Sequence, residues 1–210
     1  MGRYVGPSCR QCRREGVKLF LKGTKCETAK CQIERRQRSL APGMHGWRKA
    51  RLGEYGVRLR EKQKIKRYYG VYQQQFMRFF HLAKRIKGNT GENLLQLLER
   101  RLDNVVFLTG FAHSRAHARQ LINHGHFLVN ESRVTVPSFQ VKAGDVVTFR
   151  ERSAKSEDVK AMLEVHKNKA VPGWLEADWD GKTARIVALP TRADITMPVE
   201  EHMVVELYSK

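Results

Sequence analysis

The spacing of apolar residues predicts three helices in the middle of the chain, at residues 55–69, 71–86 and 92–106. Gly70 is the predicted stop of the first helix and Gly110 follows the third. The core-like positions of the second helix are Phe76, Phe79, Phe80, Ala83 and Ile86. Because these positions repeat with a helical period, we expect the aromatic rings to lie in a core and not to stack on nucleobases.

The pattern changes at Gly125 from a helical period to the period of two that is typical of strands. Ser114 is the predicted N-cap of a short helix that runs to His124, and Gly125 is its predicted stop. Strands are predicted at residues 127–129, 134–136 and 146–149, a polar helix at 156–168, and β-like runs at 185–189 and 203–208. Residues 1–53 show no sustained period, so the predicted class is α+β with an extended arm.

The charge is strongly asymmetric along the chain. Its 210 residues hold 40 Lys and Arg against 21 Asp and Glu, which gives a formal net charge of +19. Residues 1–70 alone hold 20 cations and 5 acids, a net of +15. A charge this large repels itself unless an anionic partner neutralises it, and nucleic acid is the abundant polyanion of the cytosol. The asymmetry therefore predicts nucleic-acid binding.

Composition excludes several other classes of protein. With 41% hydrophobic residues the chain can bury a core, so it is not a disordered polycation throughout. No apolar run approaches the roughly 18 residues of a membrane-spanning helix, and the first seven residues contain no apolar core of a secretory signal. We therefore expect a cytoplasmic protein without a membrane partner.

All four cysteines lie in the first 31 residues, as Cys9-x2-Cys12 and Cys26-x4-Cys31. In a cytosolic protein such pairs are typical of metal ligands, and four thiolates suit one tetrahedral Zn²⁺. Neighbouring Arg and Lys residues favour the thiolate form that metal binding requires. With four protein ligands, this zinc would be structural. An iron–sulfur cluster on the same four sulfur atoms is the alternative occupant that the spacing leaves open.

Two segments combine cations with a predicted helix. Residues 58–67 hold six cations and the single acid Glu61, and like charges four residues apart destabilise a helix that lacks a counter-charge. In residues 114–120, Arg115 and Arg119 share one face of a helix whose free N-terminal N–H groups suit phosphate. We expect both of these side chains to be exposed, so that Ala at both positions weakens nucleic-acid binding and costs within about 1 kcal/mol of stability.

The sequence resembles a known family, the bacterial small-subunit ribosomal protein S4 family, in its cysteine-containing branch. The resemblance runs in order from the first residues to at least Phe149. Its motifs are Gly2-Arg3-Tyr4-Val5-Gly6-Pro7, the segment from Cys9 to Gly23, Pro42-Gly43-x-His45-Gly46, Leu59-Arg60-Glu61-Lys62-Gln63-Lys64, Leu98-Glu99-Arg100-Arg101-Leu102-Asp103-Asn104-Val105-Val106, Gly110-Phe111-Ala112, Ser114-Arg115, Ala118-Arg119-Gln120-Leu121 and His124-Gly125-His126.

The resemblance implies four segments: a basic metal-binding arm at 1–45, a helical rRNA-binding domain at 46–98, a helix–hairpin RNA-binding module at 99–165, and a C-terminal region at 166–210 that packs back on the others. The implied fold is α+β: a metal-pinned basic arm, a helical domain, and an inserted module of short helices with an antiparallel sheet. The implied function is that of a structural constituent of the small subunit, which binds a multi-helix junction of 16S rRNA early in subunit assembly. Such proteins neighbour ribosomal protein S5, line the mRNA entry path and influence decoding accuracy. Some repress translation of their own messenger, and that activity is an open alternative here.

The candidate RNA-binding residues are the cations of the arm and of the helix at 58–67, together with polar residues of the short helix. They are Arg3, Arg10, Arg13, Arg14, Lys18, Lys22, Lys30, Arg35, Arg36, Arg38, His45, Arg48, Lys49, Arg58, Arg60, Lys62, Lys64, Lys66, Arg67, Arg115, His117, Arg119, Gln120 and His124.

The chain departs from the family pattern at Leu108-Thr109, at Ala116-His117 and at Glu131. The last follows Asn130 where the family usually has Gly. In a type I′ hairpin turn Glu131 would need a positive φ, which costs roughly 1 kcal/mol against Gly. An acid at this tip also weakens its attraction for phosphate, so we expect the tip not to touch RNA.

Two other functional classes compete with this interpretation. The same small module is appended to RNA-modifying enzymes, but no catalytic constellation and no glycine-rich phosphate loop stands out here, so we expect no catalytic residue and no small-molecule substrate. A zinc-finger DNA regulator would need a recognition helix and a dimerisation element after the cysteines, and residues 32–53 suggest neither. Preference for a folded RNA junction over duplex DNA of equal length separates the ribosomal interpretation from the DNA regulator.

Overall fold

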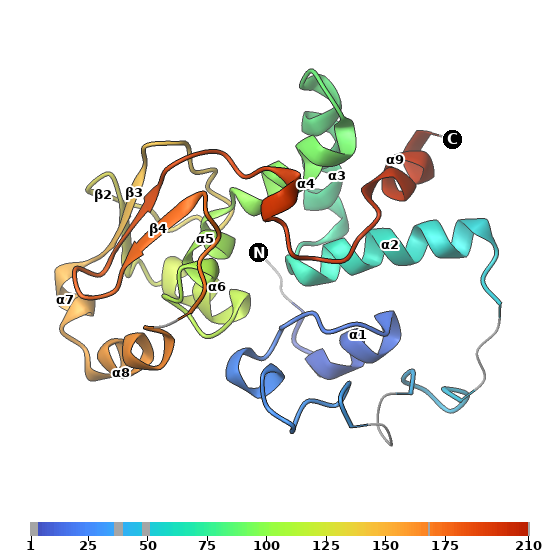
Figure 1. Ribbon diagram of the computed structural model, residues 1–210, viewed down its shortest axis with the longest axis horizontal. Helices are drawn as coiled ribbons and strands as arrows, with labels where there is room; N and C mark the ends of the chain where they lie inside the picture. The colour runs from blue at the N-terminus through green and yellow to red at the C-terminus, as the bar shows by residue number, and fades with distance from the viewer. Residues whose placement is uncertain (1–3, 36–39, 48–50, 168, 210) are drawn as a thin grey trace. The chain divides into compact units, whose positions relative to one another are not determined.

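The computed structural model describes residues 4–35, 40–47, 51–167 and 169–209. Their contacts divide the chain into two compact units, residues 1–94 with 197–210, and residues 95–196 (Figure 1). The sequence-based division into four segments thus becomes two units here, with the last residues of the chain joined to the first unit. Among the described residues, no helix has both the length and the apolar character needed to cross a membrane.

The first unit is helical. Its elements are α1 (Ser8–Glu15), the 3-10 turn η1 (Gly23–Cys26), α2 (Glu54–Tyr68), α3 (Gln73–Arg85), the start of α4 (Thr90–Glu99), and α9 (Glu201–Ser209). The predicted helices at 55–69 and 71–86 are confirmed to within two residues. Two expectations are wrong: α1 lies in the arm where no period was found, and the β-like run at 203–208 is the helix α9. Gly16 ends α1 with φ 72°, in the left-handed region that Gly adopts at little cost.

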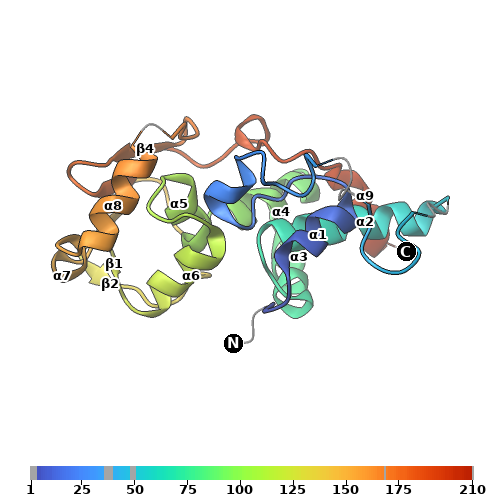
Figure 2. The same ribbon diagram turned by 90° about the horizontal axis from the view of Figure 1, so that it is seen from below.

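Aromatic packing joins α3 to α9 inside this unit. Phe76, Phe79, Phe80 and Ala83 are buried, as the helical period predicts, whereas Ile86 is exposed. The ring of Tyr208 lies 4.8 Å from that of Phe80, centroid to centroid, and Gln73 donates a hydrogen bond of 2.9 Å to the Tyr208 hydroxyl. In both views α9 lies along α2 (Figure 2). The C-terminal helix therefore belongs to the core of the first unit.

The second unit packs helices against a five-stranded antiparallel sheet of order β2-β1-β3-β5-β4. Its elements are the end of α4, α5 (Leu102–Leu108), α6 (Arg115–Asn123), β1 (Phe127–Val129), β2 (Ser132–Arg133), β3 (Val146–Phe149), α7 (Glu151–Ala154), α8 (Glu157–His166), β4 (Leu175–Asp178), β5 (Thr183–Ile186) and the 3-10 turn η3 (Arg192–Asp194). One apolar core joins α5, α6 and α8 to the sheet. This confirms the α+β class.

The strand predictions hold in part. The strands at 127–129 and 146–149 are confirmed, and β5 covers the start of the run predicted at 185–189. The second strand of the hairpin is Ser132–Arg133 and not 134–136, because Leu128 pairs with Arg133 and Val129 with Ser132 across a two-residue turn. The strand β4 was not predicted, since its sequence Leu-Glu-Ala-Asp has little of the β-branched character of strands.

The helix predicted at 92–106 is broken at Arg101, which has extended backbone dihedrals (φ −68°, ψ 135°). The segment 137–141 supplies the backbone partners that the helix loses. The Leu102 N–H donates to the Phe139 carbonyl at 2.9 Å, and the Val141 N–H donates to the Arg100 carbonyl at 3.0 Å. Periodicity alone does not reveal this break, because the apolar positions continue in phase through α5.

Candidate nucleic-acid interface

The basic helix α2 neutralises part of its own charge within the first unit. Four of its six candidate cations make ion pairs: Arg58 with Glu54 and Glu206, Arg60 and Arg67 with Glu15, and Lys64 with Glu61. The counter-charge that the sequence assigned to nucleic acid is therefore supplied in part by α1, α9 and α2 itself. These four cations support the fold as well as remaining candidates for RNA contact.

The other two cations of α2 have no such acid among the described residues. Lys62 is buried, and its Nζ lies 5.8 Å from the centroid of the Tyr208 ring. Burial lowers the pKa of Lys62, and the positive charge of Arg60 lowers it further. Burial likewise lowers the pKa of Lys66, aided by Lys62 and Arg67. An anion placed beside these ammonium groups would relieve the repulsion between them.

A buried carboxylate links the cysteine segment to the basic helix. The side chain of Glu15 is 0% exposed and pairs with Arg67 and, at 3.3 Å, with Arg60. Burial raises the pKa of Glu15, while Arg67 and Arg60 oppose that rise. Because Glu15 is the last residue of α1, the pair of ion contacts holds α1 against α2.

The four cysteines are free thiols on α1, on η1 and in the loop that follows η1. Cys12 and Cys26 are buried, and Cys9 and Cys31 are half-buried. Burial raises the pKa of Cys12, and the negative charges of Cys26, Cys9 and Cys31 raise it further. The Lys22 N–H donates a hydrogen bond of 3.4 Å to the Cys26 sulfur. Within the described residues, no three His, Cys, Asp or Glu side chains already stand in a geometry that holds a metal ion.

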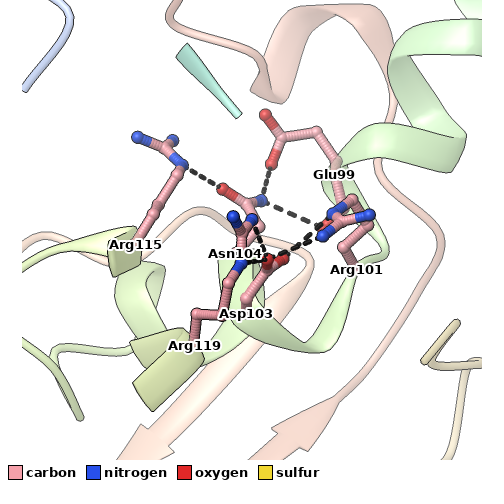
Figure 3. Close-up of polar contacts among 6 residues, drawn as sticks. All are labelled: Glu99, Arg101, Asp103, Asn104, Arg115 and Arg119. Carbon is pink, nitrogen blue, oxygen red and sulfur yellow. Dashed lines mark hydrogen bonds and ion pairs between the residues drawn. The ribbon is translucent and has the colours of Figure 1, made fainter. Parts of the chain in front are cut away.

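The start of α6 is fixed to α5 by a buried polar network (Figure 3). The Asp103 carboxylate accepts two hydrogen bonds from Arg101, at 3.0 and 2.7 Å, and two from Arg119, at 3.1 and 2.6 Å. Asn104 donates to the Glu99 side chain and to the Glu99 carbonyl, and its own Oδ1 accepts from Arg115 Nε at 2.8 Å. One carboxylate thus orients two guanidinium groups from different elements.

The structure corrects the expectation that Arg115 and Arg119 are both exposed. Arg115 is only 5% exposed, and its guanidinium carbon lies 4.5 Å from the centroid of the Phe107 ring. Arg119 is half-buried, with 22% of its side chain exposed. Arg115 is held in this buried position by its hydrogen bond to Asn104 and by the Phe107 ring, and Arg119 is held by Asp103. Arg115 therefore has a structural role that the sequence did not indicate.

The other candidates on this helix divide by burial. Gln120 and His124 are exposed, and His117 is half-buried with its ring stacked 5.5 Å from that of His113. The Ser114 hydroxyl accepts from the His117 N–H at 3.2 Å, which confirms the predicted N-cap. Burial lowers the pKa of His117, and His113 and His126 lower it further. Of the candidates on α6 and its C-cap, Gln120 and His124 are therefore the ones that solvent reaches most directly.

The arm presents most of its described cations to solvent. Exposed candidates are Arg10, Arg14, Lys22, Lys30, Arg35 and His45. Arg13 and Lys18 are half-buried, and Lys18 pairs with Glu34. Five candidates lie outside the described residues: Arg3, Arg36, Arg38, Arg48 and Lys49.

The hairpin tip has the geometry that was expected to be costly. Asn130 and Glu131 have φ 47° and 66°, as a type I′ turn requires. The Asn130 side chain compensates locally, because its Nδ2 donates to Asp145 and its Oδ1 accepts from the Val146 N–H, each at 2.9 Å. Glu131 is exposed, so the tip is acidic where an RNA-contacting loop would be basic.

Sequence reasoning missed the network that positions α6. Glu99, Arg101, Asp103 and Asn104 are all buried. One signal in the sequence could have revealed it. These four charged or amide residues lie among the core leucines and valines of an otherwise apolar segment, where their side chains cannot all reach solvent. Polar groups at such positions must be paired with one another.

A cation-rich helical unit and a second unit that sets short helices on a small antiparallel sheet define the class as an RNA-binding structural protein. A family model described as "Ribosomal protein S4/S9 N-terminal domain" matches residues 3–99, and one described as "S4 domain" matches residues 100–147. Together they cover more than half of the chain.

Curated relatives agree over the whole length. The chain is 59% identical to the small ribosomal subunit protein uS4 of Thermoanaerobacter sp. (strain X514), over 210 residues and 100% of both chains. The proteins of the same name from Citrifermentans bemidjiense and Desulforamulus reducens are 54% and 53% identical, again over 100% of both chains. The chain therefore belongs to the small ribosomal subunit protein uS4 family. This membership confirms a ribosomal, rRNA-binding and cytoplasmic protein that is not an enzyme.

Proposed function

We propose that this protein binds a multi-helix junction of 16S rRNA early in assembly of the small subunit. The observation that carries the proposal is the set of exposed arm cations, Arg10, Arg14, Lys22 and Lys30, which pair with no acid among the described residues. Glu15 and Glu34 are already engaged by other cations, and Glu27, the acid nearest in sequence to Lys22 and Lys30, forms no ion pair with either of them among the described residues. The positive charge of the four arm cations is thus available to RNA phosphates, and contacts with phosphate dominate the affinity of protein–nucleic acid complexes.

A matched pair of variants tests this use of the arm. Replacing Arg10, Arg14, Lys22 and Lys30 by Gln should weaken binding of the full chain to a 16S rRNA transcript and lower the slope of log K against log salt by about 3–4, at roughly 0.7–0.9 per phosphate contact. The control removes four exposed cations of the second unit, Arg152, Lys155, Lys160 and Arg185. Equal slopes in both variants would contradict the proposal, as would equal affinity for duplex DNA of the same length.

We also propose that the four thiolates hold one structural Zn²⁺. The donor set suits zinc chemically: Cys9 and Cys12 lie on α1, Cys26 ends η1, Cys31 follows η1, two of these four free thiols are buried, and the Lys22 N–H donates to the Cys26 sulfur. Bound zinc would link Cys26 and Cys31 to α1, which carries Cys9 and Cys12. Four protein ligands leave no position for substrate, so the role is structural.

Metal analysis of the protein as purified tests the zinc proposal. About one zinc per chain is expected in the wild type, and Cys9→Ala or Cys31→Ala should abolish it and expose residues 1–45 to protease. Detection of iron and inorganic sulfide in place of zinc would indicate an iron–sulfur cluster and would overturn the zinc proposal. Unchanged zinc content in both variants would refute a four-cysteine site.

The family resemblance extends the proposal to the neighbourhood on the ribosome: contact with ribosomal protein S5, a position along the mRNA entry path, and an influence on decoding accuracy. Crosslinking in native small subunits, with both partners mapped, tests the first two. Misreading of a reporter in cells that carry variants of this chain tests the third. Translational autorepression is tested by adding the protein to a translation reaction programmed with its own messenger. Unaltered synthesis would exclude it.

A further inference from the structure

A solvent-open hollow of about 320 Å³ lies in the first unit between α1 and the loop at 40–47. Its described lining combines apolar and polar groups: Arg13, Gln32, Leu40, Ala41, Gly43, Met44, Gly46 and Trp47. The volume is at the lower end of the roughly 300–1,000 Å³ of small-ligand sites. None of the ion pairs described above occupies it.

The loop that walls the hollow is held in one shape. Arg13 Nη1 donates to the Leu40 carbonyl at 3.4 Å, which ties the rim to α1. A Cβ placed on Gly46 would lie 2.0 Å from the Ala41 carbonyl oxygen, so only Gly allows the two backbone segments to approach this closely. The Gly46 N–H also donates to the Gly43 carbonyl at 3.3 Å. The hollow is therefore shaped by backbone contacts and not only by side chains.

Large apolar side chains face solvent at this hollow. Trp47 is 63% exposed, Met44 85% and Leu40 48%. The other two tryptophans, Trp174 and Trp179, are buried or half-buried. These three side chains line one hollow together, which distinguishes them from apolar residues that are exposed singly. The cation Arg13 and the amide Gln32 beside them distinguish this surface from a purely apolar docking groove.

We propose that the hollow binds one unstacked nucleobase of the RNA, with the base on the Trp47 ring, its edge toward Gln32 and the adjoining phosphate near Arg13. This rests on the proposed rRNA binding and adds a site within it. A nucleobase offers the flat apolar face that an exposed indole stacks on, the polar edge that an amide can pair with, and the negative phosphate that a guanidinium attracts. A basic protein segment would be repelled by the +15 of residues 1–70, so nucleic acid suits the surrounding charge better.

Three substitutions at one position separate stacking from other contacts. In binding of the full chain to a 16S rRNA transcript, Trp47→Ala is expected to weaken affinity about 5- to 100-fold, as for the loss of one stacked base. Trp47→Phe should stay within about threefold of the wild type, whereas Trp47→Leu should resemble Ala because it cannot stack. The salt slope should not change, since no phosphate contact is removed. Leu82→Ala, which removes a similarly exposed apolar side chain from α3, is the matched control and should have no effect.

Fluorescence gives a second measurement that does not depend on a variant's affinity. Stacking of a base on the indole should quench the Trp47 emission as RNA is added, and the quenching should be missing in Trp47→Phe. Affinity of Trp47→Ala within twofold of the wild type, or full binding by Trp47→Leu, would overturn the base-stacking site while leaving rRNA binding intact. Failure of the wild type itself to bind the transcript would instead overturn the proposed function, and the site with it.

Discussion

Replacing Asp103 by Asn should unfold the second unit at markedly lower denaturant, because this carboxylate balances two guanidinium groups at once. Its side chain is 1% exposed and the Arg101 side chain 2%. Asn keeps the shape of Asp but removes the charge, and it presents an NH₂ group to one of the two donors. Arg101 would then be a buried cation that has lost its ion pair with Asp103.

The magnitude follows from the unequal burial of the two arginines. Removing one partner of a buried ion pair costs about 3–5 kcal/mol, because the remaining charge is desolvated and uncompensated. Arg119 is 22% exposed and can be rehydrated, so Arg119→Gln should cost only about 1 kcal/mol. Arg101 still pairs with Asp103 in that variant. The network therefore predicts a large loss of unfolding free energy for Asp103→Asn and a small loss for Arg119→Gln.

Urea unfolding followed by tryptophan emission measures both losses. A Trp47→Phe background leaves Trp174 and Trp179 as the reporters, and both lie in the second unit. Asp180→Asn is the control, since Asp180 pairs with Lys167 at the surface with both side chains more than half exposed. A loss below about 1 kcal/mol for Asp103→Asn, or equal losses for Asp103→Asn and Arg119→Gln, would refute the argument that burial of Arg101 sets the cost.

Three further predictions follow from strained or desolvated groups. Glu131→Gly should raise the free energy of unfolding by about 1 kcal/mol, because Gly adopts the positive φ without strain, and a lower value in urea unfolding would count against it. Burial lowers the pKa of His117 and His126, so below about pH 6.5 the unfolded chain binds more protons than the folded one. The second unit should accordingly lose stability as pH falls from 7 toward 5, and His117→Gln should flatten that dependence. Lys62→Met should leave stability at pH 7 unchanged or higher while weakening rRNA binding, and unaltered affinity would remove Lys62 from the interface.

The sequence predicted elements well where one local signal dominated. Ser114 lies at the start of α6 and Gly125 just beyond its end, because each satisfies the backbone at a helix end. Phe76, Phe79 and Phe80 are buried because their spacing places them on one face of their helix. Glu131 was expected to need a positive φ from the hairpin turn alone, and it has one. These outcomes depend on few residues and on geometry within one element.

Prediction failed where distant parts of the chain decide the conformation. The break at Arg101 depends on backbone contacts with residues 137–141, and α9 is a helix because Tyr208 packs on α3 and Glu206 pairs with Arg58 on α2. A β-branched pair at Val204 and Val205 favoured a strand locally, and tertiary packing overrode that preference. The burial of Arg115 likewise depends on Asn104, whose position only the fold determines.

The two groups of cations in this protein carry different kinds of information about RNA binding. Arg58, Arg60, Arg67, Arg101 and Arg119 are paired with acids, so their replacement perturbs the fold as well as any contact with RNA. Arg10, Arg14, Lys22 and Lys30 of the arm form no ion pair with an acid among the described residues, so their charge acts directly on a partner. A loss of affinity therefore identifies an RNA contact only when the unfolding free energy is unchanged. By that criterion Arg10 and Lys22 are informative positions for mapping the interface, whereas Arg115 is not, because its burial couples any change in binding to a change in stability.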